Sequence, residues 1–231
     1  MLKIAIYVFL GNIGSPCYVG LYTRCGVNIL LVEYRGYGLS TGSPSECGFY
    51  YDGEAAVEYL MNRNDINHQK IVLYGHSLGG AVATHLASMS LRWKEKISAV
   101  ILENTFTSIQ QIGAHIFQNV IPFISKLPAF FLKNRYESVD KIKNIDVPIL
   151  FICGDKDEIV PYQMTINLSE HSSNILNELV VIPGGTHNDT WCVSDLYYQK
   201  ISLFLHKIFN SHSNSFQNHT DTTNNITYDS T

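Results

Sequence analysis

A serine between two glycines follows directly on a short apolar run in the segment IVLYGHSLGG, residues 71 to 80. Ile71 to Tyr74 has the length and composition of a buried parallel strand, and the small apolar residues from Ala81 to Ala87 indicate a packed helix. A serine between two such elements lies on a sharp turn with strained backbone angles, and the flanking glycines leave room for the strand and the helix. This context favours Ser77 as an exposed nucleophile over a serine in an ordinary glycine turn.

The start of the predicted helix adds a second element of the chemistry. Backbone N–H groups in the first turn of a helix have no partner within the helix, and the helix dipole favours negative charge there. The N–H of Leu78 is the first of these groups. We therefore expect it to stabilise the oxyanion that forms when Ser77 attacks an acyl group.

Two further predicted strands end in loops that contain a carboxylate and a histidine. Pro148 to Gly154 leads to Asp157, and Leu179 to Pro183 leads to His187 in a glycine-rich loop. A nucleophilic serine needs a base, and the base needs a carboxylate to orient it. We expect His187 to take the proton of Ser77 and to return it to the leaving group, and Asp157 to fix the tautomer of the imidazole.

The acid has competitors in the sequence. Asp155 and Glu158 lie in the same loop as Asp157, and Glu103 ends another predicted strand. Asp157 is favoured because it lies two residues before Val160-Pro161, where the loop turns toward the next helix. A turn carboxylate is the simpler interpretation of Asp155, and Glu103 stays open as an alternative acid.

Other histidines compete for the base by residue type alone. His76 precedes the nucleophile and is expected to line the pocket, whereas His85 lies on a predicted helix, where packing or solvent exposure explains it. The remaining competitors are His68, His115, His171 and His206. His187 is favoured because its loop follows the last strand and can reach over the sheet toward Ser77.

Apolar runs and helical patterns alternate along the chain. This alternation predicts an α/β fold with a mostly parallel sheet and helices on both faces. The strands are expected at residues 29–34, 71–74 and 97–104, and the helices between them at residues 53–61 and 79–89.

The alternation is lost from Thr105 to Asn144, where phenylalanines and other large apolar residues accumulate around two prolines. We interpret residues 105–144 as a small cap that could bind an acyl chain; helices packed on the sheet explain the same pattern equally well. Residues 1–209 are then one domain. Residues 210–231 are polar and are expected to be a disordered tail.

Several linked motifs resemble the alpha/beta-hydrolase superfamily and, within it, the subfamily of alpha/beta-hydrolase domain-containing protein 13. One is the serine turn, GHSLG at residues 75–79. The others are YRGYG at residues 34–38, ENTF at residues 103–106 and GTHNDTW at residues 185–191. The resemblance runs from about Asn28 to Phe209, and Asp157 matches the acid position of the superfamily. It implies a serine hydrolase acting on an ester or thioester, in a subfamily tethered to membranes by an upstream apolar helix.

The amino-terminal segment departs from that family. Ile4 to Leu10 resembles a strand whose following loop carries a His-Gly-Asn sequence in the family, but here the chain reads Leu10-Gly11-Asn12. Gly11 is therefore the weaker candidate for the second oxyanion donor. Losing one donor costs roughly 3 to 4 kcal/mol, a factor of about 100 to 1000 in rate, so we expect reduced activity.

The first two strands of the family's sheet, and any anchor before them, have no counterpart in this sequence. The resemblance thus implies a truncated or altered amino terminus. Residues 28–34 would then form an exposed apolar sheet edge, which is either a liability for solubility or a docking site for another chain.

Composition narrows the class of protein. The 231 residues are 45% hydrophobic and 16% charged, which is enough for one domain with a substantial core. A net charge of -4 and the absence of basic clusters argue against a nucleic-acid partner. The five cysteines are scattered, so neither a metal site nor a disulfide framework is indicated, and a serine nucleophile needs no cofactor.

The apolar start from Met1 to Leu10 is too short to span a bilayer, which takes about 20 residues. A strand is the favoured interpretation over a signal peptide, because no clear cleavage pattern follows. The family resemblance implies association with a membrane, while this chain, without the anchor, is expected to be soluble or peripheral.

Three functions follow from these observations. The first is a serine esterase or thioesterase that cleaves a small-molecule or acylated substrate, such as an acyl-protein or a lipid, through an acyl-enzyme. The second is a hydrolase-fold peptidase with the same three residues. The third is a catalytically impaired form that acts as an interaction module.

Overall fold

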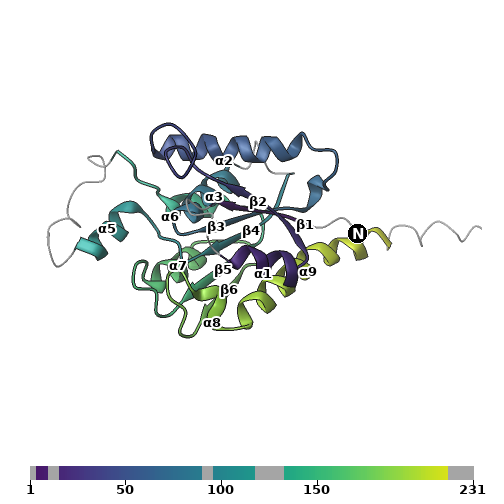
Figure 1. Cartoon of the computed structure of the whole chain (residues 1–231). Coiled ribbons are helices and arrows are strands. Elements are labelled where there is room, and N and C mark those ends of the chain that lie inside the picture. Colours follow the sequence, from purple (N-terminus) through teal and green to yellow (C-terminus); the bar gives the residue numbers. More distant parts are fainter. Residues whose placement is uncertain (1–3, 10–15, 90–95, 118–132, 218–231) are drawn as a thin grey trace, which may run out of the picture.

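A six-stranded sheet forms the centre of the computed structural model, which describes residues 4–9, 16–89, 96–117 and 133–217 (Figure 1). The strand order is β2-β1-β3-β4-β5-β6, and every neighbouring pair is parallel. The strands are β1 (Ile4–Phe9), β2 (Val27–Val32), β3 (Ile71–His76), β4 (Ile97–Glu103), β5 (Ile149–Gly154) and β6 (Glu178–Ile182). The predicted α/β fold with a mostly parallel sheet is confirmed.

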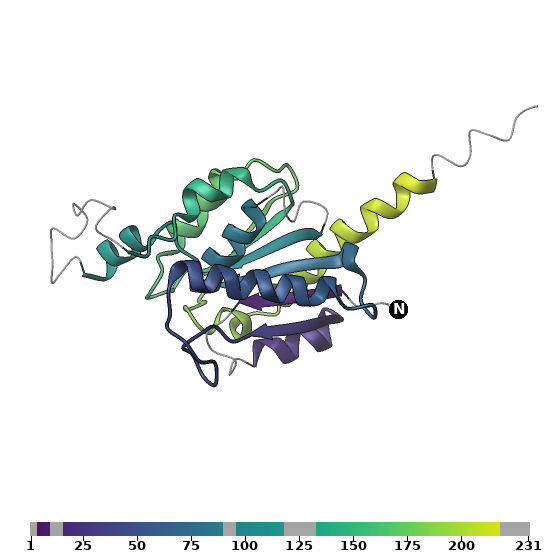
Figure 2. The same cartoon turned by 90° about the horizontal axis from the view of Figure 1, so that it is seen from above.

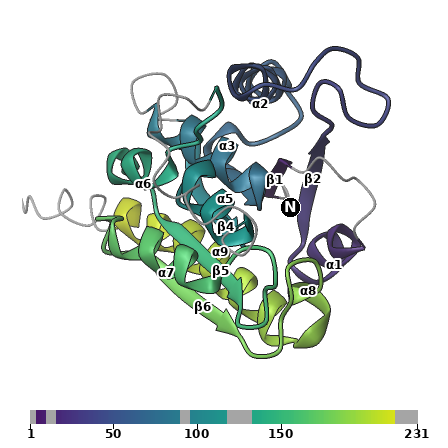
Figure 3. The same ribbon diagram turned by 90° about the vertical axis from the view of Figure 1, so that its left-hand side faces the viewer.

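Helices cover both faces of the sheet, as expected. They are α1 (Cys17–Arg24), α2 (Glu46–Met61), α3 (Leu78–Ser88), α5 (Ile109–Phe117), α6 (Ser138–Lys141), α7 (Tyr162–Glu170), α8 (Thr190–Val193) and α9 (Leu196–Gln217). Helices α1 and α9 pack on one face, and α2, α3 and α7 pack on the other (Figures 2 and 3). Short 3₁₀ turns at His68–Lys70 and Ile142–Asn144 precede β3 and β5.

The side chains of β3 show how the two faces are built. Ile71 and Leu73 join the core beneath α2 and α3, whereas Val72 and Tyr74 join the core beneath α1 and α9. Each of these four side chains is at most 1% exposed. Because successive strand residues point to opposite faces, a strand buried on both faces is apolar at every position.

Helix α2 begins earlier than the sequence pattern predicts. The expected start at residue 53 is wrong, since the helix begins at Glu46. The side chain of Ser45 accepts a hydrogen bond from the N–H of Gly48 at 3.1 Å and so caps the first turn. Two glycines in the first half of the helix masked this start in the sequence.

Strand β2 lies at one edge of the described sheet, in agreement with the expected edge at residues 28–34. The strand ends at Val32, however, and the chain then turns inward. Tyr34 is fully buried and stacks on Phe49 with ring centroids 4.7 Å apart. The exposed edge is therefore shorter than expected.

The segment interpreted as a cap is described only in part, because residues 118–132 and most of its predicted apolar cluster lie outside the described residues. Helix α5 extends away from the sheet at the left of Figure 1. Helix α9 continues to Gln217, past the tail boundary expected at residue 210, since a helix once formed adds residues at little cost. None of the helices within the described ranges is long and apolar enough to cross a bilayer.

We predict that Leu73→Ala lowers the free energy of unfolding by about 2 to 5 kcal/mol, because it leaves a cavity between the sheet and its helices. Leu39→Ala is the matched control: Leu39 is 97% exposed, and its loss is expected to change stability by less than about 0.5 kcal/mol. Urea unfolding of both variants measures the difference. Equal effects would contradict the described packing of β3.

Candidate active site

Ser77 lies between β3 and α3 in a backbone conformation that few side chains adopt. Its φ is 54° and its ψ is -119°, and its main chain caps the start of α3. A Cβ atom on Gly75 would lie 2.3 Å from the carbonyl oxygen of Gly79, and one on Gly80 would lie 2.4 Å from Thr105 Oγ1. The turn therefore depends on Gly75, as expected, and also on Gly80, which the sequence analysis did not single out.

The structure brings the three predicted residues together. His187 Nε2 lies 3.1 Å from Ser77 Oγ, and His187 Nδ1 lies 2.7 Å from Asp157 Oδ2. The side chains of His187 and Asp157 are 6% and 0% exposed. A serine, an imidazole and a carboxylate thus form one continuous hydrogen-bonded row from the ends of β3, β6 and β5.

The hydrogen bonds of the other carboxylate oxygen of Asp157, Oδ1, indicate which tautomer His187 adopts. Asp157 Oδ1 accepts the backbone N–H groups of Ile159 at 2.9 Å and Val160 at 2.7 Å. Oδ2 is left to accept the proton on His187 Nδ1. In that tautomer the lone pair of Nε2 faces the hydroxyl of Ser77, so the arrangement can remove the hydroxyl proton and leave a nucleophilic oxygen.

The competing carboxylates occupy other positions. Asp155 Oδ1 accepts the N–H of Gly184 at 2.6 Å and so holds the histidine loop. Glu158 Oε2 accepts the backbone N–H of His187 at 3.3 Å, a contact that the sequence did not suggest. Glu103, the last residue of β4, is buried, and its Oε2 accepts hydrogen bonds from the hydroxyls of Tyr74 and Tyr197.

His76 is the competing histidine that lies nearest the row. Its Nε2 lies 2.7 Å from the carbonyl oxygen of His187, and the two rings are 4.8 Å apart. Burial, together with the neighbouring His187, lowers the pKa of His76 to about 4. The ring is therefore neutral at pH 7, and its Nε2–H donates to that carbonyl.

The other competing histidines have partners elsewhere in the described structure. His85 stacks on Tyr50 with ring centroids 3.6 Å apart, and burial lowers its pKa to about 4. His68, His171 and His206 contact Arg63, Asn167 and Asn210. His115 is exposed on α5.

The two expected oxyanion donors differ in what the structure says of them. Leu78 is the first residue of α3, so its N–H is among those without a partner in the helix. Gly11 lies outside the described residues. Within the described part of the chain, no group of three or more histidine, cysteine, aspartate or glutamate residues could hold a metal ion.

Asn104 is a site neighbour that sequence reasoning missed. It is 1% exposed, has a φ of 46° and donates hydrogen bonds to the loop that carries His187. The signal was an asparagine directly after a buried strand, since asparagine tolerates the left-handed region better than most residues.

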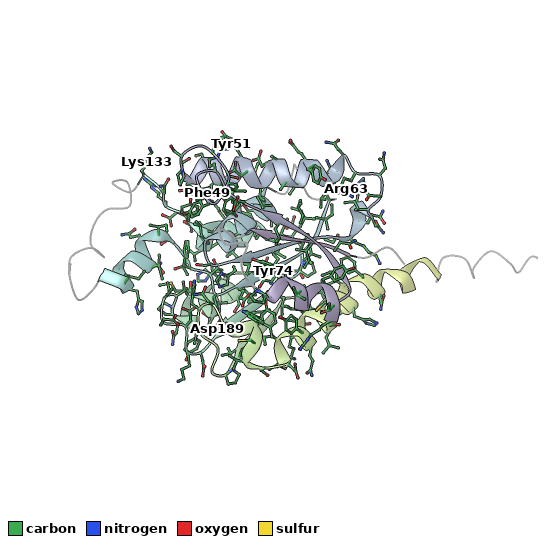
Figure 4. All side chains as sticks on the ribbon, viewed as in Figure 1. Phe49, Tyr51, Arg63, Tyr74, Lys133 and Asp189 are labelled. Carbon is green, nitrogen blue, oxygen red and sulfur yellow. The ribbon has the colours of Figure 1, made fainter. Side chains whose placement is uncertain are left out.

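The buried carboxyl of Glu103 has an unusual charge state. Burial raises its pKa to about 8, and the negative charge of Asp157 adds to the rise, while the hydrogen bond from Tyr197 opposes it. Tyr74, which shares this contact, lies in the middle of the molecule (Figure 4). Glu103 is therefore protonated at pH 7, unlike the acid of a hydrogen-bonded triad, which must stay charged.

Comparison with known proteins places these features in a family. A family profile described as "alpha/beta hydrolase fold" matches residues 10–138. Protein bem46 of Schizosaccharomyces pombe is 40% identical over 198 residues, which is 84% of this chain and 64% of that protein. The alpha/beta hydrolase domain-containing protein WAV2 of Arabidopsis thaliana is 37% identical over 190 residues, 78% of this chain and 61% of that protein. The chain spans less than two thirds of the length of these two relatives.

Solved structures agree on the fold at low sequence identity. The esterase Pf2001 of Pyrococcus furiosus matches with a TM-score of 0.68 and 18% identity, over 89% of this chain and 81% of that one. Est1E of Butyrivibrio proteoclasticus, solved with ferulic acid, matches with a TM-score of 0.63 and 19% identity, over 90% of this chain and 88% of that one.

We predict that Glu103→Gln stabilises the protein at alkaline pH. The pKa of the Glu103 carboxyl is 4.5 in the unfolded chain and about 8 in the folded protein. The stability that the neutral carboxyl gives to the folded state is therefore complete below pH 4.5 and is lost as the pH rises through 8. Glutamine does not titrate. The variant should therefore match the wild type near pH 4.5 and exceed it at pH 8 by on the order of 4 kcal/mol.

Urea unfolding at both pH values measures this difference. The control is Glu178→Gln, which removes a carboxylate from the surface ion pair with Lys207 and should change stability by less than about 1 kcal/mol. A Glu103→Gln protein that is less stable than the wild type at pH 8 would show that the carboxyl is needed in its charged form.

Proposed function

The chain belongs to the alpha/beta-hydrolase family, and we propose that it is a serine hydrolase that cleaves a carboxylic ester or thioester. The observation that carries the proposal is the hydrogen-bonded row of Ser77, His187 and Asp157, with contacts of 3.1 Å and 2.7 Å. These are the distances at which a base can take a hydroxyl proton and a carboxylate can hold the resulting imidazolium.

The first half of the reaction forms an acyl-enzyme. Ser77 Oγ attacks the acyl carbon while its proton moves to His187 Nε2. The carbonyl oxygen becomes an oxyanion beside the N–H of Leu78 at the start of α3. The bond to the leaving group then breaks, and the alcohol or thiol takes the proton from His187.

The second half returns Ser77 to its starting state. Water gives a proton to His187 Nε2 and attacks the acyl carbon of the ester on Ser77. The tetrahedral intermediate collapses, Ser77 Oγ recovers the proton from His187, and a carboxylic acid leaves. Asp157 stays ionised throughout and balances the positive charge of the imidazole in both steps.

Esters are the first substrate class to test because one structural neighbour is titled an esterase of Pyrococcus furiosus and another a monoacylglycerol lipase of Paleococcus ferrophilus. Acyl-proteins and lipids are the acylated substrates that the cap interpretation favours. A relative of Saccharomyces cerevisiae, 35% identical, is titled an uncharacterized membrane protein, so assays should include substrate in vesicles as well as in solution.

We predict that a fluorophosphonate probe labels the purified chain at Ser77 and that Ser77→Ala abolishes labelling. The matched control is Ser88→Ala at the other end of α3, where the hydroxyl donates to the carbonyl of His85 at 2.8 Å. That variant should be labelled like the wild type. Gel fluorescence and peptide mass spectrometry locate the adduct.

Failure of labelling in folded wild-type protein would contradict the proposed function and favour an interaction module. If labelling occurs, panels of acyl esters, acyl thioesters and amino-acid amides separate an esterase from a thioesterase and from a peptidase.

We predict that Asp157→Asn lowers kcat by about 10⁴-fold, because the amide N–H faces Nδ1 and favours the wrong imidazole tautomer. Asp155→Asn makes the same change two residues earlier and keeps the acceptor for Gly184, so we expect a loss of less than about tenfold. Hydrolysis of p-nitrophenyl butyrate measures both. The reverse order of effects would assign the acid to Asp155.

A further inference from the structure

The three residues at the end of β4, Glu103, Asn104 and Thr105, lie between the serine turn and the histidine loop. Their backbone and side chains are at most 3% exposed. Asn104 has a left-handed φ of 46°, which directs its side chain away from the course of the strand. A buried amide in such a conformation needs partners for every polar atom.

Asn104 finds these partners in the loop that carries His187, at the start of α8 and at the end of β5. Its Nδ2 donates to the carbonyl oxygens of His187 at 2.9 Å and Thr186 at 3.2 Å, and to Thr190 Oγ1 at 2.8 Å. Its Oδ1 accepts the N–H of Gly154 at 3.0 Å. One side chain thus connects the loop of the base with the end of β5, three residues before Asp157.

The two loops approach each other closely at this point. A Cβ atom on Gly154 would lie 2.2 Å from the carbonyl oxygen of Gly185, and the N–H of Lys156 donates to that same oxygen at 2.9 Å. Backbone packed against backbone leaves little room for either loop to move.

The same three-residue segment also holds the nucleophile. The N–H of Ser77 donates to the carbonyl oxygen of Glu103 at 2.9 Å, and Thr105 Oγ1 donates to the carbonyl oxygen of Ser77 at 2.7 Å. Both backbone polar groups of Ser77 are therefore bound by the neighbours of Asn104 in the sequence.

We propose that Asn104 is a positioning residue that fixes the distance between the imidazole of His187 and the hydroxyl of Ser77. This inference rests on the proposed function, because it concerns the same site. The amide of Asn104 binds the main chain of His187, and its sequence neighbours Glu103 and Thr105 bind the main chain of Ser77. A few hydrogen bonds through residues 103–105 therefore fix the distance from His187 Nε2 to Ser77 Oγ. A displacement of about 1 Å at a reacting pair is enough to cost about 100-fold in rate.

His76 makes the dependence on Asn104 partial. Its Nε2–H donates to the same carbonyl oxygen of His187 at 2.7 Å, so that oxygen keeps one donor when the amide is lost. Thr186 keeps the hydroxyl of Thr190 as a donor at 2.7 Å. The loop is expected to shift rather than to unfold.

Asn104→Asp tests the proposal with almost no change in shape. The acceptor for Gly154 is retained, but an oxygen replaces the nitrogen that faces two carbonyl oxygens and must move away from them. The matched control is Asn177→Asp. Asn177 accepts the N–H of Ile149 at the opposite end of β5 and donates to Ser172 Oγ, so the control makes the same exchange away from Ser77.

The measurement is steady-state hydrolysis of p-nitrophenyl butyrate, together with the rate constant for fluorophosphonate labelling at Ser77. For Asn104→Asp we expect kcat and the labelling rate to fall by about 100-fold while KM stays within about threefold of the wild type. Asn177→Asp should leave all three quantities within about threefold. Asn104→Gly, which keeps the left-handed backbone and adds no buried charge, should behave like Asn104→Asp and serves if that variant does not fold.

A folded Asn104 variant with wild-type kcat would overturn the positioning role and leave the proposed function intact. Equal losses in Asn104→Asp and Asn177→Asp would overturn it as well, because they would indicate a general effect on stability. Wild-type protein that is neither labelled at Ser77 nor active would overturn the proposed function and, with it, this inference.

Discussion

The strained backbone of Ser77 is the constraint on which the rest of the site depends. A residue other than glycine with a φ of 54° costs roughly 1 to 3 kcal/mol and persists only where its surroundings impose it. Here β3 ends and α3 begins, and Glu103 at the end of β4 and Thr105 just after it bind the two backbone polar groups of the serine. The large parallel sheet can maintain this turn because its central strands are buried on both faces.

Two buried carboxyls close to each other, those of Asp157 and Glu103, have different hydrogen-bond partners. Asp157 is bound by two backbone N–H groups and by His187, all of which stabilise its negative charge. Among the described residues, the carboxyl of Glu103 is bound by the hydroxyls of Tyr74 and Tyr197, and burial keeps it neutral at pH 7. Burial therefore decides the charge of Glu103, and a neutral Glu103 places no second negative charge beside Asp157.

Much of the fold could be predicted from the sequence, because buried parallel strands are uniformly apolar and the loops after them carry the polar residues. For the same reason Ser77, Asp157 and His187 were found at strand ends, and the structure places them within hydrogen-bond distance; their catalytic roles stay predictions. The predicted start of α2 was too late, because Gly48 and Gly53 disfavour a helix in the sequence pattern, whereas the Ser45 cap stabilises the first turn in the structure. Asn104 was missed because its partners, Gly154 and His187, are far from it in the sequence.

The relation between β4 and the site suggests how precision can arise from a parallel sheet. Neighbouring strands β3, β4 and β5 end at the same edge, so the residue after β4 lies between the serine turn and the acid loop. The side chain of Asn104 at that position reaches the end of β5 and the loop that carries His187. Asparagine suits it because its amide carries both a donor and an acceptor and its backbone tolerates a positive φ. The middle strand, which supplies no member of the row, is thus the one best placed to align it.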